Sequence, residues 1–334
     1  MNSKNRMNDI SLIKVLCILV VVFFHCYQMM WAPVHFPHVS AVYKDLYFYP
    51  VQCGIINVVM PLFVFVSGYL FICLLQRGKY PTWSNLLYKK GVRMWVPYFV
   101  FCLLFMIATN DWHPLYLLTG VYGHLWFLSM LFWCFIVGYG MYKAKLKVPI
   151  KIIFLLIVFS GTFIPMFMPS FFGLQFMSRW FYWFYLGMLV YEYKEVVFSY
   201  IAKYKLYIPL LIIYALVAYL LPVEYANYTW YCVLTVTGCI LSVIYLLMSG
   251  VDWEKYKITH SLVKLSSYSF GIYIWSAVGP FLISNTAKRI FGLPELAANH
   301  VILFPLCLSL LTFVISWCCS WIMMKTKLGR FLIG

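Results

Sequence analysis

The amino-acid sequence predicts an all-α, polytopic membrane protein with about ten transmembrane helices and both termini in the cytoplasm. Apolar residues make up 64% of the 334 residues and charged residues only 10%, whereas ordinary soluble domains carry about 25% charged residues. Many apolar runs also approach the roughly 20 residues that cross the hydrocarbon core of a bilayer. These observations exclude a soluble globular protein and favour a single membrane domain over residues 1–334.

The first predicted span, residues 11–30, follows a short segment that contains Lys4 and Arg6. Its apolar run is too long for the hydrophobic region of a signal peptide, and it lacks a small-residue cleavage site. Pro61 and Pro97 lie in the second and third spans, and the sixth span is short and lies beside Arg179. After the first, the predicted spans are residues 55–75, 92–108, 124–142, 149–168, 179–193, 206–221, 229–248, 267–283 and 301–323.

Basic residues alternate between the connections, which supports this set of spans independently. With the N-terminus in the cytoplasm, 21 of the 25 Lys and Arg residues fall in inner segments, and only Lys44, Arg179, Lys288 and Arg289 fall in outer ones. The positive-inside rule predicts such an alternation for an even number of spans. The net charge of +16 is therefore attributed to membrane topology, and nucleic-acid binding is not expected, because the basic residues form no single patch or tail.

Cysteine and histidine give no sign of a metal site. Most of the eleven cysteines lie inside predicted spans, and no C-x-x-C pair occurs, so neither a disulfide framework nor a structural zinc site is predicted. His35, His38, His113 and His300 fall in outer segments without the spacing of zinc ligands. We therefore expect no bound metal and no tightly bound cofactor.

Two ionisable side chains share the first span, where each is costly and is therefore a functional candidate. Lys14 and His25 are eleven residues apart, which places them on one helix face with an axial separation of about 16 Å. The imidazole suits a general base because its ordinary pKa is about 6.5. The alternatives are a lysine that extends to the membrane surface and a histidine that hydrogen-bonds a carbonyl in the packed core.

Three further segments carry candidate binding residues. In the second span, Ser67 supplies a hydroxyl and Gly68 permits close helix packing, although such a segment is more often a packing interface. Lys90 and Arg93 enter the third span and suit a phosphate group, or simply anchor the helix on the positive side. His124 and Trp126 open the fourth span, where they suit a sugar-sized entrance or belong to the aromatic belt at the membrane surface.

These segments resemble, in order and spacing, the acyltransferase-3 family of integral membrane O-acyltransferases. The first helix of that family carries an arginine, ten residues and a histidine, which corresponds here to Lys14 and His25. The other matching segments are residues 61–69, 90–98, 124–128, 184–188 and 269–275. The chain departs from the family pattern at Lys14, at Ser11 in place of a frequent aspartate (Asp9 lies nearby), and at Ser276 in place of a frequent histidine.

The resemblance implies a reaction and its substrates. It implies acyl transfer from cytoplasmic acyl-CoA, usually acetyl-CoA, to a hydroxyl of a cell-envelope polysaccharide or lipid-linked sugar in a bacterial inner membrane, with His25 as the catalytic base. Cationic groups at the inner side would then hold the CoA phosphates, and Ser67 or Tyr273 would donate to the developing oxyanion.

The alternative function is that of a membrane carrier, which moves a polysaccharide or lipid-linked sugar without acyl chemistry. Proton-coupled carriers often contain internal repeats and carboxylates within the membrane; the sequence shows no internal repeat, and carboxylates within the predicted spans are scarce. A scaffold without a ligand would leave the shared face of Lys14 and His25 unexplained.

Overall fold

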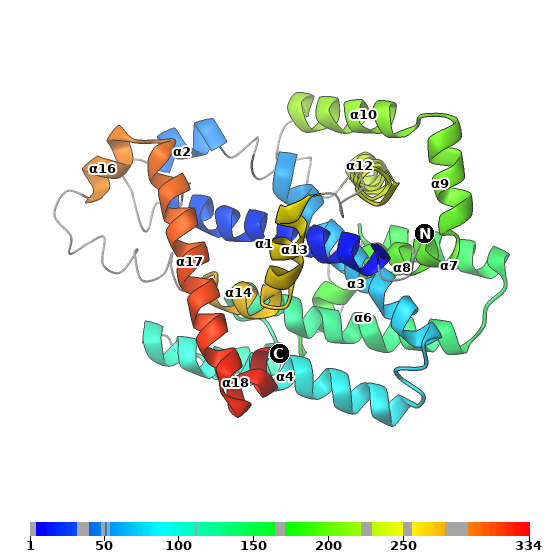
Figure 1. The fold of residues 1–334 in the computed structure, drawn as a ribbon, viewed down its shortest axis with the longest axis horizontal. Coiled ribbons are helices and arrows are strands. Elements are labelled where there is room, and N and C mark those ends of the chain that lie inside the picture. The colour runs from blue at the N-terminus through cyan, green and yellow to red at the C-terminus, as the bar shows by residue number, and fades with distance from the viewer. Residues whose placement is uncertain are drawn as a thin grey trace. The chain divides into compact units, whose positions relative to one another are not determined.

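The computed structural model describes residues 5–31, 40–47, 51, 54–110, 112–163, 171–221, 229–249, 256–277 and 293–334. All regular secondary structure in these ranges is helical, and no strand occurs in them (Figure 1). The predicted all-α class is therefore confirmed. The chain forms two compact units, one of residues Met1–Met60 and Ile201–Gly334 and the other of residues Pro61–Tyr200.

The first unit is built around α1, a single helix from Asn5 to Trp31. α1 packs against α2, α12, α13, α14 and α17, and α17 crosses it in Figure 1. α10 packs on α12 in the same unit. The helices of this unit after α1 are α2 (Ser40–Tyr47), α10 (Tyr207–Leu220), α12 (Trp230–Ser249), α13 (Lys257–Ser266), α14 (Ser269–Trp275), α16 (Leu293–Asn299), α17 (Leu303–Lys325) and α18 (Lys327–Ile333).

The second unit is built around α6, which packs against α4 and α8. α7 in turn packs on α8, and the short α5 packs on α4. α3 (Asn57–Gln76) and α9 (Lys194–Lys203) contain the points where the chain passes between the units. The other helices of this unit are α4 (Trp83–Thr109), α5 (Leu115–Thr119), the 3₁₀ turn η2 (Gly123–Leu125), α6 (Trp126–Lys143), α7 (Val148–Gly161) and α8 (Leu174–Glu192).

Local sequence explains where several of these helices begin and end. The Thr82 hydroxyl accepts a hydrogen bond from the Asn85 amide and caps α4, because the first amides of a helix have no partner within it. Asn110 ends α4 in the left-handed conformation, which asparagine tolerates better than most residues. Pro149 lies in the first turn of α7, where its missing N–H costs no helical hydrogen bond.

Within the described residues, six segments are long and apolar enough to cross a membrane, and they match six of the ten predicted spans. They are Asp9–Gln28, Gly54–Gln76, Trp83–Thr109, Leu115–Lys143, Trp230–Ser249 and Leu303–Lys325. α9 and α10 would form a seventh together, although they are bent by 84°. The chain is therefore a multi-pass membrane protein, while the count of ten and the orientation of the termini stay predictions.

The other predicted spans correspond to shorter or less apolar elements. The fifth overlaps α7, an apolar helix shorter than the six spanning segments. The sixth falls in α8, which has 19 residues and includes several polar side chains. The ninth begins two residues before α14, and its residues 278–283 lie outside the described residues, as do residues 164–168 of the fifth span, His35 and His38.

Candidate functional site

Lys14 and His25 lie on the uninterrupted helix α1. Their predicted separation of about 16 Å along one face therefore holds in the folded chain, because no kink or break intervenes. Both side chains are partly buried within the first unit. The face that they share is thus part of the packed surface of α1, as a functional position in the helix requires.

The His25 ring contacts a residue far away in the sequence. Its Nδ1 atom lies 3.1 Å from the hydroxyl of Ser276, which follows the last residue of α14. The Ser276 hydroxyl also lies 2.7 Å from the carbonyl oxygen of Tyr273, one turn earlier. The structure therefore gives the imidazole a hydroxyl partner from another helix, whereas the sequence had suggested a carbonyl as the alternative to a catalytic role.

Neighbouring contacts hold this part of the first unit together. The Cys26 thiol lies 3.5 Å from the Thr312 hydroxyl of α17, so the turn of α1 that carries His25 also packs on α17. Tyr273 and Ser276 are both buried. Sequence reasoning selected Tyr273 but assigned no role to Ser276, and no local pattern marks a serine at the end of a short helix as a histidine partner.

Ser67 and Gly68 lie on α3 and have different roles. The Ser67 hydroxyl donates to the Phe63 carbonyl at 2.9 Å, within its own helix. A Cβ atom on Gly68 would overlap the backbone carbonyl of Phe184 in α8, and one on Gly187 would overlap that of Phe65. The two glycine-containing segments therefore pack directly on each other, and the packing interpretation of Gly68 is confirmed.

Lys90 and Arg93 differ in their surroundings although they are one turn apart on α4. Lys90 is only 9% exposed, and its ammonium lies 3.3 Å from the centre of the Phe135 ring, with Tyr80 also within 5.4 Å. Arg93 is exposed. Burial raises the pKa of the Tyr80 phenol, and the positive charge of Arg93 partly offsets this rise.

His124 and Trp126 lie where η2 passes into α6. The His124 ring lies 5.7 Å from that of Phe105. Trp126 packs against two rings of α8, with centroids 5.1 Å away at Phe176 and 5.4 Å away at Trp180. Sequence reasoning identified Trp126 and not its partners on α8, because this group forms only when α6 and α8 pack together.

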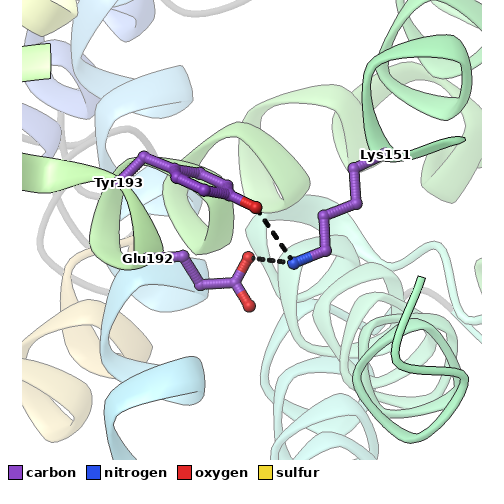
Figure 2. A network of polar contacts seen from close by, with 3 residues as sticks. All are labelled: Lys151, Glu192 and Tyr193. Carbon is purple, nitrogen blue, oxygen red and sulfur yellow. Dashed lines mark hydrogen bonds and ion pairs between the residues drawn. The ribbon is translucent and has the colours of Figure 1, made fainter. Parts of the chain in front are cut away.

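Figure 2 shows a polar network that the sequence did not predict. The Lys151 ammonium at the start of α7 lies 2.6 Å from the Glu192 carboxylate at the end of α8 and 3.4 Å from the Tyr193 hydroxyl. Both charged side chains are partly exposed. The network therefore connects the neighbouring helices α7 and α8. Its three residues come later in the sequence than the candidate residues of the second unit.

The candidate residues divide between the two units. Lys14, His25 and Tyr273 belong to the first unit, and the second unit contains Ser67, Lys90, Arg93, His124 and Trp126. Within the first unit the structure brings α1 and α14 together at His25. Across the described residues, no group of three or more His, Cys, Asp and Glu side chains is arranged to hold a metal ion.

Comparison with known protein families finds one family model that matches nearly the whole chain. Residues 7–321 match the acyltransferase-3 family model, described as an acyltransferase domain, and the match spans both units. The chain belongs to the acyltransferase-3 family. This membrane acyltransferase therefore transfers an acyl group from a donor to an acceptor. No curated protein and no solved structure matches the acyltransferase significantly.

Proposed function

We propose that this acyltransferase moves an acetyl group from cytoplasmic acetyl-CoA to a hydroxyl of a cell-envelope polysaccharide or lipid-linked sugar, with His25 as the general base. The observation that carries the proposal is the partly buried imidazole on α1, held by a hydroxyl from α14. A fixed imidazole suits proton transfer, because histidine is the side chain whose unperturbed pKa, about 6.5, lies closest to neutral pH. The proposed setting is a bacterial plasma membrane.

The reaction balances with His25 as the only proton carrier. The sugar hydroxyl oxygen attacks the thioester carbonyl carbon while the imidazole takes the hydroxyl proton. The tetrahedral intermediate then collapses, the carbon–sulfur bond breaks, and the imidazolium returns the proton to the CoA thiolate. The products are an O-acetyl ester and CoA with a free thiol, and no oxidant or reductant is needed.

The remaining candidate residues receive roles that fit their surroundings. We assign oxyanion stabilisation to the Tyr273 phenol, which belongs to the same unit as His25, whereas the Ser67 hydroxyl of the other unit donates to the Phe63 carbonyl. Ser67 then contributes to binding through the packing of α3. Tyr273 lies on α14, the helix that leads to the partner of His25.

The charged candidate residues are assigned to the acyl donor, and the aromatic ones to the sugar acceptor. Lys14 of the first unit and the exposed Arg93 of the second are each suited by charge to a phosphate group, to which arginine offers paired hydrogen bonds and lysine a point charge. Lys90 adds positive potential from its buried position beside Phe135. His124 and Trp126 suit the sugar acceptor, because an indole face and an imidazole offer apolar and hydrogen-bonding contacts together.

Mass spectrometry of envelope glycans tests this function directly. Cells that express the wild-type chain are compared with cells that lack it and with cells that express His25→Gln. The exposed histidine at position 300 provides the matched control, His300→Gln. We expect one added acetyl group with the wild type and the control, and none with His25→Gln or without the protein.

Two outcomes overturn the proposal. Acetylation that persists with His25→Gln excludes His25 as the required base. Glycan that reaches the outer surface only when the protein is present, without any acyl modification and without dependence on acyl-CoA, indicates the carrier.

A further inference from the structure

Ser276 lies at the centre of a short chain of polar contacts in the first unit. It is fully buried, it follows α14, and its hydroxyl oxygen lies within hydrogen-bonding distance of two atoms. These atoms are the Tyr273 carbonyl oxygen at 2.7 Å and His25 Nδ1 at 3.1 Å. The contact with His25 joins residues that are 251 positions apart, so it is a product of the tertiary fold.

The two contacts share a single hydroxyl hydrogen. A carbonyl oxygen accepts hydrogen bonds and cannot donate them, whereas a neutral imidazole carries its hydrogen on one of its two nitrogens. If the Ser276 hydrogen pointed at His25, two lone-pair-bearing oxygens would face each other at 2.7 Å with no hydrogen between them. The shorter contact therefore takes the hydrogen, and Ser276 offers a lone pair to His25.

This arrangement determines which nitrogen of His25 is protonated. Because Ser276 accepts at this contact, His25 Nδ1 must donate, and the neutral ring then carries its basic lone pair on Nε2. We propose that Ser276 is a positioning residue that holds His25 as the Nδ1–H tautomer, so that Nε2 is the atom that exchanges the proton in acyl transfer. The catalytic part of this inference rests on the function proposed above.

The same contact supports both protonation states that the reaction needs. When Nε2 takes the proton of the acceptor hydroxyl, Nδ1 keeps its hydrogen and its bond to Ser276. That bond then has a charged donor, and such bonds are stronger than neutral ones. Ser276 therefore fixes the ring orientation before proton transfer and stabilises the imidazolium after it, without itself gaining or losing a proton.

Nitrogen NMR of ¹⁵N-histidine-labelled protein tests the tautomer without any assay of acyl transfer. The chain contains seven histidines, and the His25 signals are assigned by their loss in His25→Gln. We expect a protonated Nδ1 and an unprotonated Nε2 in the wild type. We also expect Ser276→Ala to give a mixture of the two tautomers, and Ser276→Thr, which keeps the hydroxyl, to resemble the wild type.

Kinetics of the same variants test the consequence for the reaction. Ser276→Ala is expected to lower kcat about 10-fold with little change in KM, because the partly buried Nδ1 loses its hydrogen bond to the Ser276 hydroxyl, and Ser276→Thr is expected to restore most of the rate. Ser242→Ala is the matched control, because Ser242 is also fully buried and its hydroxyl bonds a carbonyl of its own helix at 2.7 Å. It is expected to leave kcat unchanged.

The results separate this inference from the proposed function. A wild-type His25 protonated on Nε2, or a Ser276→Ala variant with an unchanged tautomer, overturns the role of Ser276 even if acyl transfer is observed. Acyl transfer that does not depend on His25 overturns the proposed function and leaves the tautomer result standing. Because the wild-type spectrum decides the tautomer, a Ser276 variant that fails to fold still leaves the inference testable.

Discussion

Replacement of Gly187 by alanine tests whether the contact between α3 and α8 determines the packing of the second unit. A Cβ atom at this position would overlap the Phe65 carbonyl oxygen and would lie 2.9 Å from the carbonyl carbon of Phe65 and 3.0 Å from the Tyr69 amide nitrogen. Carbon atoms in van der Waals contact lie about 3.5–4.0 Å apart. The helices must therefore separate by about 1 Å, because the obstructing atoms belong to the backbone and cannot rotate away.

The size of the effect follows from two opposing terms. Overpacking of a well-packed interior costs about 1–3 kcal/mol, and alanine stabilises a helix interior by about 1 kcal/mol relative to glycine. Gly187→Ala is therefore expected to lower the free energy of unfolding by up to about 2 kcal/mol. In Gly140→Ala the new Cβ lies 3.6 Å from the Trp83 ring, an ordinary contact, so this matched control is expected to gain up to about 1 kcal/mol.

Thermal unfolding of the purified protein in detergent measures the difference. The melting temperature, followed by tryptophan fluorescence, is expected to fall for Gly187→Ala and to stay the same or rise for Gly140→Ala. A Gly187→Ala variant that melts at or above the wild-type temperature would refute the close approach of α3 and α8. Equal losses in both variants would refute the argument that the backbone carbonyl of Phe65 is the obstacle.

Two further predictions follow from charged side chains of the second unit. Lys151→Gln and Glu192→Gln should each lower the free energy of unfolding by about 1 kcal/mol or less, because the ion pair is partly exposed. A double-mutant cycle should show a coupling energy that decreases at high salt, and a coupling energy independent of salt would contradict this prediction. Arg93→Gln should raise the KM for acetyl-CoA more than Lys90→Met does, because Arg93 is exposed and the Lys90 ammonium faces the Phe135 ring. Steady-state kinetics check this second prediction, and the reverse order would contradict it.

The sequence predicted well those features that depend on one helix alone. The length and hydropathy of α1 defined the first span, and helical periodicity placed Lys14 and His25 on one face. These predictions succeeded because they depend on the backbone geometry of one element, which the local sequence determines.

Features that depend on contacts between helices could not be read from the sequence. Lys90 lies between basic neighbours and resembled an exposed anchor, but rings from other parts of the second unit bury it. The close packing of Gly68 on Phe184 and of Gly187 on Phe65 requires α3 and α8 to meet. Ser276 became a candidate only when α14 packed beside His25.

The span count shows a second limit of sequence reasoning. The 15-residue stretch 179–193 was predicted as a short span, whereas α8 begins earlier, at Leu174, and includes polar side chains such as Arg179. The 84° bend between α9 and α10 follows a turn in which Lys205 adopts a positive φ of 50°. Apolar runs predict that a segment enters the membrane, but helix ends and bends depend on turn geometry.

Acetyl transfer by purified protein in liposomes, measured for the wild type and His25→Gln, tests the central claim most directly. Labelled acetyl-CoA and an envelope glycan fraction are supplied, and the acetyl ester and the free CoA thiol are both quantified, with His300→Gln as the matched control. We expect equal amounts of ester and thiol for the wild type and the control, and neither above background for a His25→Gln protein that melts at the wild-type temperature. Ester formation by His25→Gln at the wild-type rate would contradict it.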